Sequence, residues 1–217
     1  RSLTPVYYYR LGEATGEATA VDDIGGVNNG TYQNPIVAAV PSLICDSDTA
    51  KDFASVGISG IASGYVHTGD KASITCVVNW NGSMGGDQWI TCEGGGGYNS
   101  WVAIGMTSSN WKINITYPDG SFYWWSNDIP CNVPIGVDTH ITYTIDGTAV
   151  KIYVNKTLSV SLTASRTLST AGSQMAVGSR DGGSPFNGVM DEFAYYDKTL
   201  TQTDVDALVD SWQTGCA

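Results

Sequence analysis

The chain has 217 residues and a formal net charge of −11, with 10 lysines and arginines against 21 aspartates and glutamates. A chain so poor in basic residues lacks the positive surface that binds phosphate backbones or anionic lipids, so we expect no nucleic-acid partner. No apolar run reaches the roughly 18 residues that a transmembrane helix needs, so we also expect no membrane insertion. The 26 glycines and 12 tyrosines, with 14% charged residues, favour strands joined by tight turns.

Strand-forming runs alternate with turn-forming runs from the start of the chain. An opening strand at residues 7–11 precedes a polar, glycine-rich loop at 22–31. Further strands are predicted wherever β-branched and aromatic residues gather between turn signals. These strands span residues 73–80, 88–92, 101–106, 111–117 and 122–125, with a four-glycine loop at 94–97.

The second half of the chain adds a hairpin, a last strand and a helix. Residues 139–145 and 150–154 flank an Asp-Gly turn, which predicts a β-hairpin. A strand at 189–196 is followed by Thr201 and Asp204 at the spacing of a helix-capping box. Apolar residues then recur on one helical face as far as Trp212. The sequence predicts an all-β, two-sheet antiparallel sandwich with one short C-terminal helix.

One domain over residues 1–217 accounts for this pattern, because all-β sandwiches often reach this length as a single unit. The chain starts at Arg1 rather than at a methionine. We therefore expect the domain to be part of a larger protein or assembly.

Several segments resemble, in order, the laminin-G-like domains of the concanavalin A-like lectin/glucanase superfamily. The matching segments are 8–13, 22–31, 48–53, 141–158 and 188–197, although Asp52 stands where that family usually has arginine. The resemblance implies a jelly-roll sandwich and a non-catalytic carbohydrate-binding or adhesion module of a secreted, cell-surface or virion protein. Its glycan or polysaccharide partner is then the main ligand. The alternative is a structural or decoration domain of a viral particle or surface assembly, which packs against neighbouring subunits and binds no sugar.

A structural calcium ion is the first predicted site. Alternation along the last strand places Asp191 on the same face as Phe193 and Tyr195, so its carboxylate needs a partner, and a hard cation would satisfy it. The resemblance implies such an ion between the 22–31 loop and the last strand, with Asp23 as an alternative to Asp22. The predicted ligands are Asp22, Asp23, Asn28, Thr31 and Asp191. The competing interpretation is that Asp191 accepts backbone amides.

A surface of aromatic rings is the second predicted site. Sugar rings stack on tryptophan and tyrosine while their hydroxyls bond to polar neighbours. Alternation along residues 122–125 sends aromatic rings to both faces of the strand, and only one face can be the core. We predict ligand contacts from Trp101, Tyr123 and Trp125; the alternative is that these rings, like Trp89 and Trp111, fill the core.

The residues argue against catalysis. Glycoside hydrolysis needs two carboxylates across the scissile bond, but the chain has four glutamates, and Asp191 and Glu192 are adjacent on a strand. No Gly-x-Ser-x-Gly elbow is present, and His67 and His140 are the only histidines. We therefore predict that the protein is not an enzyme and that His140 is structural.

Five cysteines leave the redox state open. They stand at Cys45, Cys76, Cys92, Cys131 and Cys216, without a Cys-x-x-Cys pair. Both two disulfides with one thiol and five reduced thiols are compatible with this pattern.

Overall fold

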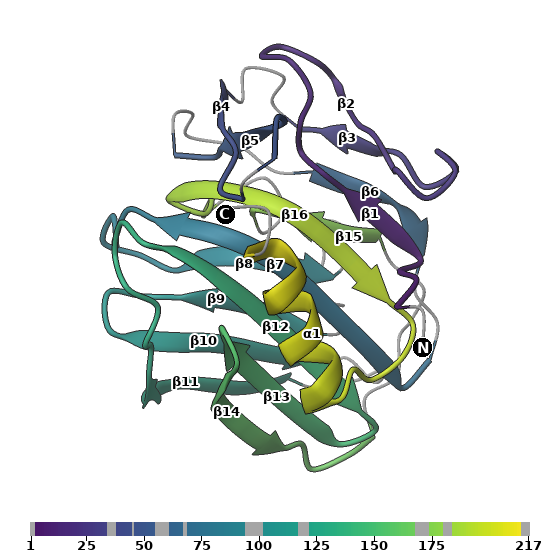
Figure 1. Ribbon diagram of the computed structural model, residues 1–217. Helices are drawn as coiled ribbons and strands as arrows, with labels where there is room; N and C mark the ends of the chain where they lie inside the picture. The colour runs from purple at the N-terminus through teal and green to yellow at the C-terminus, as the bar shows by residue number, and fades with distance from the viewer. Residues whose placement is uncertain are drawn as a thin grey trace.

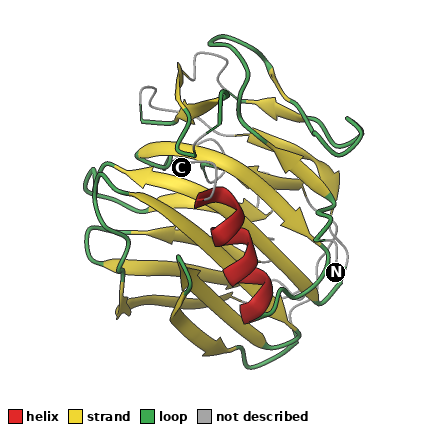
Figure 2. Ribbon diagram, in the orientation of Figure 1, coloured by secondary structure: helices red, strands yellow, loops and turns green. Residues whose placement is uncertain are grey.

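The computed structural model shows two antiparallel sheets packed face to face, with one helix over the outer face of the front sheet (Figures 1 and 2). The structure describes residues 3–33, 38–44, 46–54, 61–66, 69–93, 102–116, 122–167, 174–179 and 184–213. The side chains of residues 64–66, 93, 116, 122–128, 174 and 213 are outside this description.

The front sheet has eight strands in the order β14-β13-β12-β7-β16-β5-β4, and β1 also pairs with β16. Their bounds are β1 (Tyr7–Tyr9), β4 (Ala38–Pro41), β5 (Thr49–Asp52), β7 (Lys71–Trp80), β12 (Asp138–Asp146), β13 (Ala149–Val154), β14 (Thr157–Thr163) and β16 (Gly188–Tyr196). The strands β1 and β16, which are the first and the last in the chain, pair with each other in this sheet (Figure 1). The predicted hairpin is confirmed, with Asp146 opposite Ala149.

The back sheet also has eight strands, in the order β11-β10-β9-β8-β15-β6-β3-β2. Their bounds are β2 (Thr19–Ala20), β3 (Gly30–Tyr32), β6 (Ile61–Val66), β8 (Gln88–Glu93), β9 (Val102–Met106), β10 (Asn110–Thr116), β11 (Phe122–Pro130) and β15 (Gln174–Val177). The predicted two-sheet antiparallel sandwich is therefore confirmed.

The main core lies between the sheets. In β7, Ile74, Cys76 and Val78 belong to this core at every second position, as strand alternation requires. Trp111 of β10 is in the same core and is 1% exposed, and its Nε1 donates to Ser159 Oγ of β14 at 3.1 Å. A side chain of one sheet thus reaches an edge strand of the other.

The single helix of the described chain, α1 (Gln202–Gln213), begins as predicted. The backbone N–H of Thr201 donates to Asp204 Oδ2 at 2.8 Å, and the N–H of Asp204 donates to Thr201 Oγ1 at 3.3 Å. This reciprocal pair is a capping box, which satisfies amides that the first turn leaves unpaired. Val205 and Leu208 then pack in a second apolar cluster with Tyr153 of β13, so the helix lies on the front sheet.

A β-bulge in β16 overturns one prediction. Asp191 pairs with Val77, but the next paired residue is Ala194 opposite Thr75, and Glu192 has a φ of 55°. The extra residue shifts the alternation, since Met190 and Phe193 both belong to the main core. Asp191 therefore lies on the opposite face from Phe193 and Tyr195, toward the side covered by the helix.

Candidate functional site

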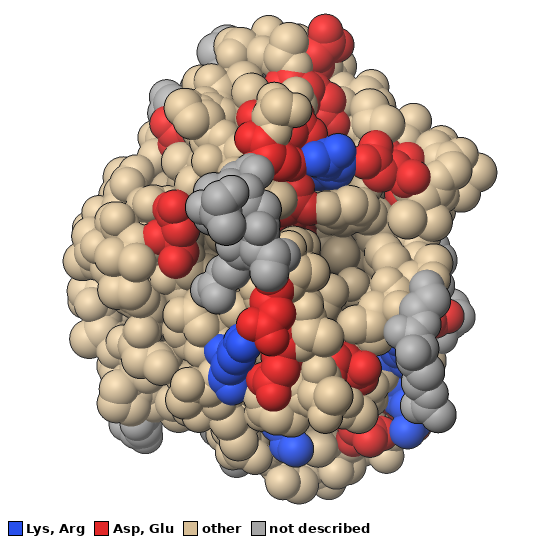
Figure 3. Space-filling model, in the orientation of Figure 1, with Lys and Arg blue, Asp and Glu red and all other residues tan. Residues whose placement is uncertain are grey.

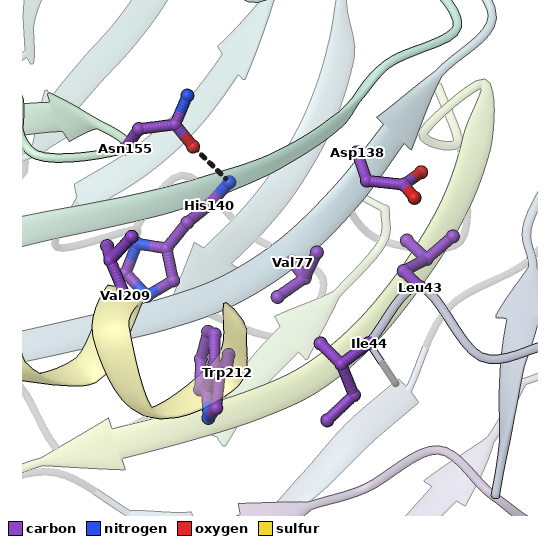
Figure 4. Close-up of a pocket in the computed structure, with 8 residues that line it drawn as sticks. All are labelled: Leu43, Ile44, Val77, Asp138, His140, Asn155, Val209 and Trp212. Carbon is purple, nitrogen blue, oxygen red and sulfur yellow. Dashed lines mark hydrogen bonds between the residues drawn. The ribbon is translucent and has the colours of Figure 1, made fainter. Parts of the chain in front are cut away.

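A cleft beside the C-terminal end of α1 combines apolar walls with a polar rim (Figure 4). Val209 and Trp212 of α1 line one side, and the chain before β5 lines the other. Val77 and His140 of the front sheet lie between these walls. The cavity measures about 210 Å³, and its described lining residues are Leu43, Ile44, Val77, Asp138, His140, Asn155, Val209 and Trp212.

His140 belongs to the floor and is held in place on three sides. Its Nε2 lies 2.8 Å from Thr75 Oγ1, and its backbone N–H donates to Asn155 Oδ1. The centroid of its ring lies 4.5 Å from the centroid of the Trp212 ring. Burial lowers the pKa of His140 to about 3, so the ring is neutral at physiological pH. The structural role predicted for His140 is consistent with these contacts.

Asp191 fixes the wall opposite the helix. Its Oδ2 accepts the Leu43 backbone N–H at 2.9 Å and the Ser42 hydroxyl at 2.8 Å, and its Oδ1 accepts the Glu192 N–H. These bonds anchor the segment that supplies Leu43 and Ile44 to the cleft. Burial raises the pKa of Asp191 to about 6.

The rim offers what a sugar ring needs. Trp212 is half-buried and lines the cleft beside aliphatic side chains. Asp138 Oδ1 accepts from Asn79 Nδ2 at 2.6 Å, and its second carboxylate oxygen has no hydrogen-bond partner among the described residues. Asn155 uses its Oδ1 on His140 and has an amide nitrogen without a described partner. An aromatic face beside unused polar atoms can stack on a ring and bond its hydroxyls.

The aromatic residues singled out from the sequence have different fates. Trp101 lies outside the described residues, and so do the side chains of Tyr123 and Trp125 in β11. Their predicted ligand contacts therefore stay predictions. Trp89 and Trp111 are buried. The sequence pattern assigned Trp212 only to the apolar face of the helix and did not predict it as a site residue. Its position in the last turn of α1 was the one feature of the sequence that could have indicated a surface role.

Among the predicted metal ligands, Asp22 is hydrogen-bonded to Asn28, whereas Asp191 is hydrogen-bonded to other residues. Asp22 accepts the backbone N–H groups of Tyr8, Ile24 and Asn28 at 2.9–3.2 Å, and it shares no hydrogen-bond partner with Asp191. Asp23 is exposed, and Thr31 is an exposed residue of β3. All five ligands carry oxygen, which suits calcium, but the described residues include no group of three acidic, histidine or cysteine side chains that could hold a metal. The calcium prediction keeps its support from the sequence alone.

Acidic side chains gather around a basic patch where the region of β4, β5 and β16 reaches the surface (Figure 3). Arg10 contacts Asp46, and its Nε lies 3.3 Å from Asp48, 3.8 Å from Glu192 and 3.9 Å from Asp23. Glu192 is 1% exposed, and neither carboxylate oxygen has a hydrogen-bond partner in the described structure. Burial raises the pKa of Glu192 to about 7. We call these five residues the Arg10 cluster.

The two acidic residues whose pKa values are strongly raised, Asp191 and Glu192, are both buried and adjacent in the chain. On a regular strand these two adjacent side chains would point to opposite faces, but the bulge interrupts that alternation. Asp191 and Glu192 are each 1% exposed. The Asp191 carboxylate holds the segment of Ser42 and Leu43 in position, whereas the Glu192 carboxylate lies 3.8 Å from Arg10 Nε without a hydrogen bond in the described structure.

The thiols that can be described are few. Cys76 is a buried free thiol, and burial raises its pKa to about 12; Cys131 is a half-buried free thiol. Cys45 and Cys216 lie outside the described residues.

A family model described as the concanavalin A-like lectin/glucanases superfamily matches residues 59–206, which is more than half of the chain. The chain belongs to this family. The match confirms the family inferred from the sequence and covers the hairpin and closing motifs, whereas the opening motifs lie before the matched residues. No curated protein matches the sequence.

Solved structures with the same fold come from several larger proteins. Domain 4 of AbnA, a GH43 extracellular arabinanase from Geobacillus stearothermophilus solved with arabinotriose, has a TM-score of 0.71 at 20% identity and covers 95% of this chain and 98% of that chain. The binding domain of Paraclostridial Mosquitocidal Protein 1 has a TM-score of 0.69 at 15% identity, covering 96% and 52%. Trypanosoma rangeli sialidase has a TM-score of 0.67 at 12% identity, covering 99% and 34%. This chain therefore spans about half of the solved mosquitocidal binding domain and about a third of the sialidase chain. At these identities the likeness shows the fold alone.

No helix within the described ranges is long and apolar enough to cross a membrane.

Proposed function

We propose that this chain is a non-catalytic carbohydrate-binding module of an extracellular or surface protein, and that the cleft beside α1 holds the sugar. The observation that carries the proposal is the half-buried Trp212 ring, which stands over aliphatic walls with Asp138 and Asn155 at the rim. The family is a lectin and glucanase superfamily, and one protein of the same fold was solved with arabinotriose. The burial of Asp191 and Glu192 supports binding without hydrolysis.

The test is binding to a glycan array, followed by titration of the best glycan with wild type and a Trp212→Ala variant. Loss of the ring removes both stacking and apolar contact, so we expect affinity to fall roughly tenfold or more. A Trp212→Phe variant keeps a smaller aromatic face and should lose less. Sugar binding should also change the fluorescence of Trp212.

The matched control is Leu208→Ala. Leu208 lies on the same helix and packs against the second apolar cluster, but it does not line the cleft. This variant should lose stability and keep its affinity for the glycan. Binding to no glycan would contradict the proposed function, and unchanged affinity in Trp212→Ala would contradict the assignment of the site.

Structural calcium is part of the proposal and rests on the resemblance of the 22–31 loop and the last strand. If the ion binds the folded state, calcium raises the melting midpoint relative to chelator, by about 3 kcal/mol of stability when the ion exceeds its dissociation constant about a hundredfold. An Asp22→Asn variant should lose most of this difference, whereas Asp146→Asn should keep it. Equal midpoints of the wild type in calcium and in chelator would contradict the prediction.

A second candidate is a structural domain that packs against neighbouring subunits. It is favoured by the exposed apolar side chains of Met84, Ile135 and Val137, which belong to two adjoining loops. Ile135 lies in contact distance of the Gly82 position, so the loops adjoin. A silent glycan array together with self-association in sedimentation experiments would favour this candidate.

A further inference from the structure

We propose that the cleft beside α1 accepts a single terminal sugar ring without negative charge and discriminates against carboxylated and sulfated sugars. The inference rests on the proposed function and adds the chemical class of the ligand. It follows from the charges around the cleft and from the size of the cavity.

The described lining has one ionised group, and that group is negative. Asp138 stands at the rim, and neither lysine nor arginine occurs among the described residues that line the cavity. His140, the remaining titratable residue of the lining, is neutral at physiological pH because burial lowers its pKa to about 3. The described residues of the lining therefore offer no cation to a carboxylate or sulfate.

The basic side chain that follows the rim in sequence is already paired. Lys156 comes directly after Asn155, but its Nζ contacts Asp210 Oδ1 of α1, and its carbonyl accepts from Gln202. On the opposite wall, the carboxylate of Asp191 accepts the Leu43 amide. Negative groups thus stand at the rim and behind one wall, and the whole chain carries a net charge of −11.

The cavity suits one ring rather than a chain. Its volume of about 210 Å³ is below the roughly 300–1,000 Å³ of pockets that enclose drug-sized ligands. Trp212 and Val209 close one side, and Leu43 and Ile44 close the other (Figure 4). A terminal ring can enter between these walls and stack on the indole, whereas a polysaccharide crossing the site would need an open groove.

Charge repulsion determines how much more weakly an acidic sugar should bind than a neutral one. Two unit charges a few ångströms apart at a wet protein surface repel enough to change affinity by roughly tenfold. An acidic sugar also needs a cation to replace the water that it loses, and the described lining has none. Neutral sugars have neither penalty. An amino sugar gains affinity because its ammonium group is attracted by the Asp138 carboxylate.

The experiment compares matched sugars that differ only in charge. Methyl galactoside is paired with methyl galacturonide, methyl glucoside with methyl glucuronide, and each neutral sugar with its 6-sulfate; glucosamine is the cationic member. Each is titrated against wild type, Asp138→Asn and Asp146→Asn while tryptophan fluorescence is recorded. Asp146 is the control because its replacement changes the net charge equally, at the far end of β12 and paired with Lys71.

Wild type should bind the best neutral sugar roughly tenfold or more tightly than its acidic partner. Asp138→Asn should reduce the ratio of the affinities for the neutral and the acidic sugar, and Asp146→Asn should leave this ratio unchanged. Binding of an acidic sugar as tightly as its neutral partner, with both lost in Trp212→Ala, would overturn the inference and leave the proposed function intact. Failure of every sugar and every array glycan to bind would overturn both.

Discussion

Replacing Trp111 with alanine is expected to lower the free energy of unfolding by about 3–5 kcal/mol, as large-to-small changes of buried aromatic residues do. Trp111 is 1% exposed in the main core and reaches from β10 of the back sheet to Ser159 of β14 in the front sheet. The variant therefore loses apolar burial, creates a cavity between the sheets and removes one contact that joins them. Urea unfolding followed by circular dichroism measures the loss.

Two further variants divide this effect into its parts. Trp111→Phe keeps most of the apolar volume and loses the Nε1 donor, so it should cost less than alanine. Ser159→Ala keeps the ring but removes the acceptor at 3.1 Å together with the hydrogen bond that Ser159 Oγ donates to Asn132, and should cost about 1–2 kcal/mol. If Trp111→Ala is as stable as wild type while its glycan binding is lost, Trp111 belongs to a ligand site and not to the core.

The contrast between Trp111 and Trp212 shows what composition can predict. An excess of tryptophan indicates both cores and sugar sites, because the same flat apolar ring serves both. Which role a given ring takes depends on whether the opposite sheet covers it, as for Trp111, or whether it ends a helix at a surface, as for Trp212. Strand alternation gives two faces but does not say which face a second sheet covers.

The elements that were predicted from sequence have strong local signals. The alternation in β7, the Asp-Gly turn of the β12–β13 hairpin and the capping box of α1 each depend on residues a few positions apart. The short strand β15 lacks such a pattern, and its partners β6 and β8 are distant in sequence. The strands β2 and β4 pair with the nearby β3 and β5, but two and four residues are too few to show an alternation.

The bulge at Asp191 and Glu192 shows why the candidate site was only partly predictable. Nothing in the sequence marks one residue as extra, because Glu192 carries no glycine-like signal for its φ of 55°. A one-residue shift reverses the face of every later side chain, so the inward direction assigned to Asp191 was wrong. The interpretation that Asp191 accepts backbone amides, considered beside calcium, matches its bonds to Leu43 and Glu192.

The Arg10 cluster was also beyond local reasoning. No basic residue is close to Glu192 in sequence, but the pairing of β1 with β16 brings Arg10 to it from the other end of the chain. The buried Glu192 carboxylate, without a hydrogen-bond partner among the described residues, thus depends on a guanidinium that is itself 39% exposed. This arrangement makes a prediction about both stability and pH.

Arg10→Met is expected to lower the free energy of unfolding by about 2 kcal/mol at pH 8. Methionine keeps the aliphatic stem but removes the charge that offsets Glu192, Asp46 and Asp48. Removing one partner of a fully buried ion pair costs about 3–5 kcal/mol, and exposed pairs contribute about 0–1 kcal/mol. The expected value lies between these limits because Arg10 is 39% exposed whereas Glu192 is 1% exposed.

The loss should depend on pH through Glu192, whose pKa is raised from 4.5 to about 7 in the folded chain by burial. Between these values the folded state holds a proton that the unfolded state has released, so the contribution of Glu192 to stability falls as pH rises through this window. In Arg10→Met the remaining carboxylates oppose the ionisation of Glu192 without a nearby positive charge, so the stability should fall more steeply with pH. The stability lost on replacing Arg10 should therefore be smaller at pH 5 than at pH 8. In a Glu192→Gln background the pH dependence of the Arg10→Met cost should shrink, since the buried group can no longer ionise. Equal costs at both pH values in both backgrounds would show that Arg10 acts only on the three aspartates of the cluster, and that the buried glutamate is stabilised without it.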